Sequence, residues 1–181
     1  MAKIVDGDRP VIFFAVVLFL SGCQIREPLS AQVSASETGR LPQSTIDSQL
    51  AEATFRYQFT HNASGQQSST SAFCIGYGAN PSRNGDPFDP PKSFLARLSD
   101  IHPPVLPYSF CSSTNAGVIA NETREPALIF TISSVKCADN SHCEVEGGYY
   151  EAPLSSSGNT YSLERKDGKW VVVKDTMHWI S

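Results

Sequence analysis

Apolar residues recur at the spacing of an α-helix between residues 46 and 59. Ser44 or Thr45 can cap the start of this helix, with Asp47 in its first turn. A polar run up to Gly65 ends it. We therefore expect an amphipathic helix that packs against a sheet. Its apolar face consists of Ile46, Leu50, Ala53, Phe55, Tyr57 and Phe59.

Much of the remaining chain alternates apolar and polar residues with the two-residue period of β-strands. The expected strands cover residues 69–77, 127–136, 142–151, 159–166 and 169–176, and residues 177–180 continue the last one. A loop rich in Gly, Pro, Asn and Asp occupies residues 78–91, and a short helix is expected at 93–98. The proline-rich residues 103–107 must be extended. Gly147 and Gly148 predict a bulge or bend in their strand.

The strongest turn signal is Asp167-Gly168, which joins two alternating runs. A two-residue turn there sets the expected pairs as Lys166 with Lys169, Arg165 with Trp170, Leu163 with Val172 and Tyr161 with Lys174. The side chains on the core face of this hairpin are then Tyr161, Leu163, Trp170 and Val172. Val171 and Val173 lie on the back face, which another element could cover or a partner could meet.

The order of these elements predicts an α+β domain over residues 44–181. In this domain the N-terminal helix packs on a curved antiparallel β-sheet. The element order resembles that of cystatin-like and NTF2-like folds, in which such a sheet wraps a helix. Because these folds host enzymes, carriers and adaptors, the architecture alone does not select a function.

The leader of the chain resembles a bacterial lipoprotein signal peptide over residues 1–22. An uncharged apolar run, residues 11–20, is too short to span a bilayer, and Leu20-Ser21-Gly22-Cys23 matches the lipobox pattern. The resemblance implies that Cys23 is acylated and becomes the new N-terminus, with residues 23–43 as a flexible tether. In Gram-negative lipoproteins an Asp directly after the acylated cysteine tends to retain the protein in the inner membrane. This chain has Gln24 there, which favours the outer membrane, facing the periplasm. An ordinary cleaved signal and an uncleaved anchor are the alternatives.

Composition limits the partners and the state of the cysteines. The formal net charge of the 181-residue chain is −4 and no basic cluster stands out, which disfavours nucleic-acid binding. Beyond Cys23 the cysteines form an even set, typical of two disulfides in an exported protein: Cys74, Cys111, Cys137 and Cys143. Three connectivities are possible, and we favour Cys137–Cys143 with Cys74–Cys111. A zinc site on the same thiols, with His142, lacks paired CxxC motifs.

Catalytic patterns are weak throughout. Ser133 and Lys136 form a Ser-x-x-Lys motif, but in a strand these two side chains point to opposite faces. The carboxylates of Glu144 and Glu146 share a strand face, with Glu151 at the strand's end, as solvated surfaces commonly do. The chain has four histidines, and none has a second histidine at metal-binding spacing: His61, His102, His142 and His178. We therefore assign no catalytic residue, cofactor or metal.

The C-terminal part resembles an uncharacterised family of small bacterial exported proteins. The stretches that carry the resemblance are 147–150 (GGYY), 158–161 (GNTY), 167–172 (DGKWVV) and 179–181 (WIS), joined by Arg56-Tyr57 and Pro107-x-Ser109-x-Cys111. Members often carry cysteines just after the Tyr-Tyr pair, where this chain has Glu151 and Ser155, so its disulfides are expected to differ. The resemblance covers residues 44–181 and implies no activity.

These observations predict a periplasmic binding or interaction module held to the membrane by its lipid. A small-molecule or protein ligand would contact the concave sheet through Tyr149, Tyr150, Trp170 and Trp179. Each of these aromatics could instead be a core residue. Two alternatives are a small enzyme with a pocket inside an NTF2-like cone and an inhibitor or immunity-type lipoprotein.

Overall fold

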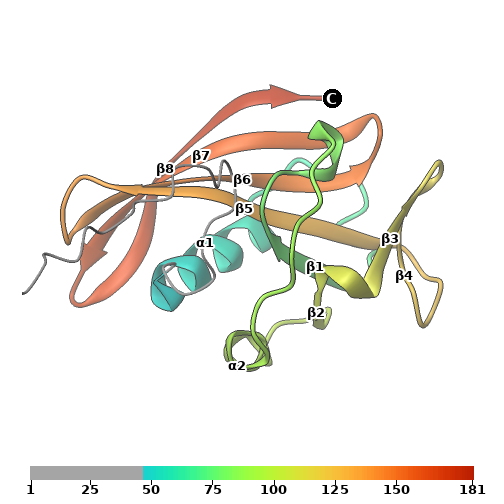
Figure 1. Ribbon diagram of the computed structural model, residues 1–181, viewed down its shortest axis with the longest axis horizontal. Helices are drawn as coiled ribbons and strands as arrows, with labels where there is room; N and C mark the ends of the chain where they lie inside the picture. The colour runs from blue at the N-terminus through green and yellow to red at the C-terminus, as the bar shows by residue number, and fades with distance from the viewer. Residues whose placement is uncertain (1–46) are drawn as a thin grey trace, which may run out of the picture. The chain divides into compact units, whose positions relative to one another are not determined.

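The computed structural model describes residues 47–181 (Figure 1). The predicted signal peptide (1–22), the acylated Cys23, the tether (23–43) and the capping residues Ser44 and Thr45 lie outside the described residues. The helices and 3₁₀ helices are α1 (Ser48–Thr60), η1 (Pro81–Arg83), α2 (Lys92–Leu95), η2 (Ala96–Leu98) and η3 (Tyr108–Phe110). The strands are β1 (Ala72–Tyr77), β2 (Val105–Pro107), β3 (Cys111–Thr114), β4 (Gly117–Ala120), β5 (Ala127–Cys137), β6 (His142–Ala152), β7 (Ser155–Lys166) and β8 (Lys169–Ile180).

The α+β class is confirmed, and the main sheet is mostly antiparallel. Its strand order is β2-β1-β5-β6-β7-β8, and β3 and β4 form a separate two-stranded ribbon. Strands β5 to β8 form an antiparallel meander, whereas β1 runs parallel to both β2 and β5. The expected antiparallel pairing therefore holds for β5 to β8, whereas the edge formed by β1 and β2 is parallel. The long connection from β1 to β5 allows the parallel pairing, which a short turn cannot.

Helix α1 lies against one face of the sheet and closes the main core (Figure 1). Phe59 stacks on Phe73 at 4.8 Å between ring centroids, and both rings meet Phe130 edge-on at 5.2 and 5.3 Å. Burial of large aromatic side chains supplies much of the stability of a domain of this size. The inner face of the sheet is thus filled by side chains of α1 and α2, including Phe55 and Phe94.

A second, smaller core lies under the β3–β4 ribbon. It consists of Ala72, Cys74, Cys111, Val118, Ala120, Ala127, Ile129 and Tyr150. A disulfide between Cys74 and Cys111 ties β1 to the ribbon, and a second one between Cys137 and Cys143 ties β5 to β6 near their turn. The favoured pairing of the four cysteines is therefore confirmed.

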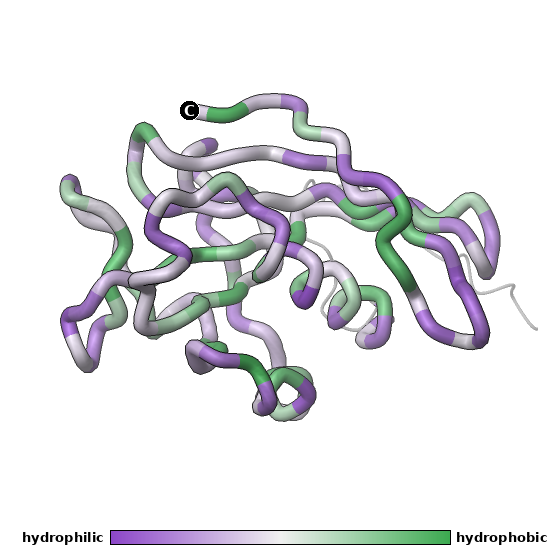
Figure 2. Tube along the Cα trace, turned by 180° about the vertical axis from the view of Figure 1, so that it is seen from behind, coloured by the Kyte–Doolittle hydropathy of each residue, from purple (hydrophilic) through white to green (hydrophobic). Residues whose placement is uncertain are grey.

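The β7–β8 hairpin follows the predicted register only near its turn. Lys166 pairs with Lys169, and the match holds as far as Leu163 and Val172. An irregularity then shifts the pairing, so that Tyr161 lies opposite Asp175 rather than Lys174. The core-face assignment is confirmed, because Tyr161, Leu163 and Trp170 are buried in the main core and Val172 packs against it. The back-face residues Val171 and Val173 are 43 % and 42 % exposed, and residues 171–173 form a hydrophobic stretch next to the hydrophilic turn (Figure 2).

The sequence predicted a bulge or bend at Gly147 and Gly148 of β6, but the irregularity lies on the neighbouring strand, β5. The register between β5 and β6 shifts at Ser133, next to the pairing of Ile132 with Gly147. Gly147 has another role, because a Cβ there would overlap the Thr131 carbonyl oxygen and lie 2.8 Å from Gln58 Nε2. Gln58 of α1 donates a hydrogen bond to that same carbonyl at 3.1 Å. Gly147 therefore permits close approach of α1 to the sheet.

Asp47 caps α1 and also joins it to the hairpin. Its Oδ1 accepts a hydrogen bond from the Gln49 backbone N–H at 2.8 Å, and its Oδ2 accepts one from Trp170 Nε1 at 3.1 Å. The sequence placed Asp47 in the first turn, whereas it is the N-cap.

Replacing Asp47 with alanine is expected to lower the free energy of unfolding by about 1–2 kcal/mol, because a cap and a tertiary hydrogen bond are both lost. Urea denaturation measures this loss. Asp47→Asn is the matched control, since its amide oxygen can still cap the helix and the loss should be smaller. Equal losses for the two variants would contradict the capping role.

Candidate functional site

A small groove of about 180 Å³ lies where the long loop after β1 crosses the sheet. Gly147 faces α1, because a Cβ added there would lie 2.8 Å from Gln58 Nε2. Consecutive residues of a strand point to opposite faces of the sheet, so Glu146 points away from α1. Glu146 lines the groove, which therefore opens on the face opposite α1. Among the residues around it are Arg83, Thr131, Glu146, Gly158, His178 and Trp179.

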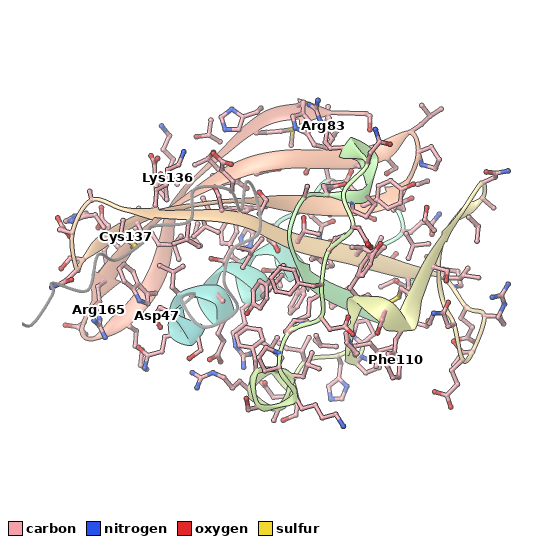
Figure 3. All side chains as sticks on the ribbon, in the orientation of Figure 1. Asp47, Arg83, Phe110, Lys136, Cys137 and Arg165 are labelled. Carbon is pink, nitrogen blue, oxygen red and sulfur yellow. A yellow bond between two sulfur atoms is a disulfide. The ribbon has the colours of Figure 1, made fainter. Side chains whose placement is uncertain are left out.

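Asn80 anchors the loop between β1 and α2 over the sheet. Its Nδ2 donates to the carbonyl oxygens of Tyr149 at 2.9 Å and Ser157 at 3.3 Å. Its Oδ1 accepts from the Ser82 backbone N–H at 3.0 Å, which caps the short η1. These bonds fix the end of η1 beside β7 and β8, where Figure 3 labels Arg83. The loop path is visible in Figure 1.

Arg83 and Trp179 form the wall of the groove. The Arg83 guanidinium carbon lies 4.6 Å from the centroid of the Trp179 ring system, in cation–π geometry. Gly158 pairs with Trp179, and a Cβ at Gly158 would overlap the indole. The missing side chain at Gly158 therefore leaves the space that the indole occupies. Arg83 is exposed, and within residues 47–181 it has neither a salt bridge nor a side-chain hydrogen bond, so its N–H donors face solvent.

Three further polar residues line the groove. The carboxylate of Glu146 is exposed, with Lys136 Nζ 3.9 Å away. The Nε2 of His178 is hydrogen-bonded to Thr160 Oγ1 at 2.7 Å. The hydroxyl of Thr131 is fully buried and has no hydrogen-bond partner in the described part of the chain. A buried hydroxyl without a partner costs about 1–3 kcal/mol, so native proteins seldom keep one without a reason.

The four predicted contact aromatics do not share one surface. Tyr149 lies in the main core, and Tyr150 lies in the second core with its hydroxyl 2.9 Å from Ser113 Oγ. Trp170 is 8 % exposed and donates to Asp47. Trp179 alone lines the groove opposite α1. The concave face expected to present all four is covered by α1.

Two larger grooves lie elsewhere on the described part of the chain, and several of their charged side chains form ion pairs with one another or with neighbours. One of about 490 Å³ lies between α1, η2 and the β7–β8 turn. There Arg56 bonds Asp100 at 2.8 Å, which raises the pKa of the Arg56 guanidinium, and Arg97 bonds Glu52 at 2.7 Å. Another, of about 410 Å³, lies beside the Cys137–Cys143 disulfide. The smaller groove is distinguished by the guanidinium of Arg83 over the Trp179 ring and by the buried hydroxyl of Thr131.

The other chemical motifs remain separate from one another. Ser133 donates its hydroxyl to the Glu146 carbonyl oxygen at 3.2 Å, so it has a structural partner. Glu144 and Glu146 are exposed on β6, whereas Glu151 is buried and accepts hydrogen bonds from Ser64 and Ser155. His61 follows α1 and stacks on Tyr57 at 4.1 Å.

Sequence reasoning found Trp179 but missed Arg83, Asn80 and Thr131. The signal that could have found them is the length of the loop between β1 and α2, since long loops in compact domains are commonly functional. Nothing local to Thr131 distinguishes it from a strand residue of the core.

None of the helices within residues 47–181 is long and apolar enough to cross a membrane. In the same residues, no group of three or more His, Cys, Asp or Glu side chains is placed to hold a metal ion. No family model, curated protein or solved structure matches this chain.

Proposed function

We propose that this chain is a lipid-anchored bacterial lipoprotein whose folded domain binds a small ligand in the groove between Arg83 and Trp179. Acylated Cys23 would hold it at the outer membrane, facing the periplasm. The observation that carries the binding role is the exposed Arg83 guanidinium, which lies over Trp179 without a carboxylate partner in the described residues, in a groove that Thr131 and Glu146 also line. Binding sites commonly combine such a held aromatic with a few convergent polar groups.

The size of the groove limits its ligand. Sites for drug-sized molecules span roughly 300–1,000 Å³. The groove measures about 180 Å³, which suits a small metabolite or the end of a longer chain. The polar groups on its walls favour a polar or charged molecule.

The proposed lipid anchor and periplasmic location rest on observations other than the groove. The lipobox Leu20-Ser21-Gly22-Cys23 precedes a domain that contains two disulfides. Disulfides persist in oxidising compartments such as the periplasm. The C-terminal motifs are consistent with membership in the family of small bacterial exported proteins that they resemble.

The finer architecture is also a proposal. Packing of α1 on the antiparallel strands β5 to β8 supports a cystatin-like or NTF2-like arrangement. The parallel strands β1 and β2 depart from the meander of those folds. The space that an enzyme pocket would need inside such a cone is filled here by Phe55, Phe130 and Tyr149.

The test uses the two tryptophans of the full chain as site and control probes. The protein is labelled with ¹⁵N-tryptophan and titrated with a library of small polar compounds while the two indole N–H signals are recorded. We expect at least one compound to shift the Trp179 signal saturably and to leave the Trp170 signal in place. A library that shifts neither signal would overturn the binding role of the groove.

A matched pair of glycine variants localises the response. Gly158→Ala should displace the indole and weaken binding about tenfold or more, since an added Cβ overlaps Trp179. Gly65→Ala is the control, because an added Cβ there meets open space. Binding that survives Gly158→Ala unchanged would place the ligand elsewhere.

A further inference from the structure

We propose that the ligand of the groove is a small zwitterion, with its carboxylate held by Arg83 and its ammonium held by Glu146. This inference rests on the proposed binding function and adds the chemistry of the ligand. Free amino acids and the ends of short peptides share this chemistry.

Arg83 provides the carboxylate end. A guanidinium has five N–H donors in a planar fork that matches a carboxylate with two parallel hydrogen bonds. The Arg83 guanidinium carbon lies 4.6 Å from the Trp179 ring centroid, and this contact keeps the fork at the wall of the groove. Because Arg83 has no carboxylate partner within residues 47–181, a ligand does not have to displace one.

Glu146 provides the opposite charge in the same groove. Its side chain is 52 % exposed, and its Lys136 neighbour is 3.9 Å away, at the outer limit of an ion pair. Exposed pairs of this kind are weak, so a ligand ammonium can compete for the carboxylate. A ligand with only a carboxylate would meet repulsion from Glu146, and one with only an ammonium would meet repulsion from Arg83.

The remaining groups fit a small polar ligand. Thr131 lies beneath the groove with a buried hydroxyl, and His178 is exposed and keeps its Nδ1 free of any bond in the described chain. The volume of about 180 Å³ leaves little room beyond the two charged groups and a short side chain. A molecule with one carboxylate and one ammonium uses both charges of the groove at once.

Four probes separate the possible ligands in titrations of the full ¹⁵N-tryptophan-labelled chain at constant ionic strength. Alanine carries both charges close together, and the dipeptide Ala-Ala carries them further apart. Acetate carries the carboxylate alone, and ethylammonium carries the ammonium alone. We expect alanine or Ala-Ala to shift the Trp179 indole signal saturably, and acetate and ethylammonium to bind about tenfold or more weakly. If alanine binds more tightly than Ala-Ala, the ligand is a free amino acid. If Ala-Ala binds more tightly, the ligand is the end of a peptide.

Charge-removing variants assign each end of the ligand. Arg83→Gln and Glu146→Gln should each weaken binding of the better zwitterion about tenfold or more. Lys92→Gln, an exposed cation on α2, is the control and should change binding less than about twofold. An unshifted Trp170 signal in each variant shows that the fold is intact.

Two results would overturn the zwitterion while leaving the groove as a binding site. In the first, acetate binds as tightly as alanine and Ala-Ala, and Glu146→Gln has no effect. In the second, the library compounds shift the Trp179 signal but neither zwitterion does. Failure of every compound to shift that signal would instead remove the proposed function itself.

Discussion

Replacing Cys74 and Cys111 together with alanine is expected to lower the free energy of unfolding by about 4 kcal/mol. The two cysteines are 37 residues apart in sequence, and their disulfide joins β1 to the β3–β4 ribbon. Without it, the unfolded chain gains the entropy of a long open loop, and the second core loses its covalent tie. Urea denaturation of the full chain under oxidising conditions measures the loss.

The second disulfide is the matched control for this loss. Cys137 and Cys143 are only 6 residues apart, so the same loop-entropy argument predicts about 2 kcal/mol for their double alanine variant. The order of the two losses is the informative result. A larger loss for the short loop would contradict the assignment of the long-range disulfide as the main covalent support.

Replacing Phe130 with alanine is expected to cost about 3–5 kcal/mol, because it leaves a cavity in the centre of the main core. Phe130 is fully buried and meets Phe59 and Phe73 edge-on. A shift of the urea midpoint, with the slope of the transition unchanged, would measure this effect.

Phe110 is the matched control in η3. Its side chain is 50 % exposed, so Phe110→Ala should cost less than about 1 kcal/mol. Comparable losses for the two variants would mean that the aromatic cluster between α1 and the sheet does not form the main core.

The parts of the fold that local signals encode could be predicted from the sequence. The helical spacing of Leu50 and its neighbours places α1, and Asp167-Gly168 gives the last hairpin. The parallel pairing of β1 with β5 could not be predicted, because a long crossover has no turn signal. The β3–β4 ribbon was also missed, since Cys111–Thr114 is short and polar.

The candidate site was predictable only in part. Trp179 stands out as an aromatic residue, but the same criterion also selects the core residues Tyr149 and Trp170. The position of Arg83 depends on hydrogen bonds from Asn80 to backbone atoms 69 and 77 residues further along the chain. Such long-range contacts leave no local pattern, so composition can indicate the loop but not where it docks.

The proposed function requires that acylated Cys23 hold the disulfide-bonded domain at a membrane. Mass spectrometry of the N-terminal peptide, from protein isolated with the membrane fraction, tests this most directly. The prediction is a peptide that begins at Cys23 and carries fatty-acyl groups. An unmodified Cys23 thiol, or an intact leader still beginning at Met1, would contradict it.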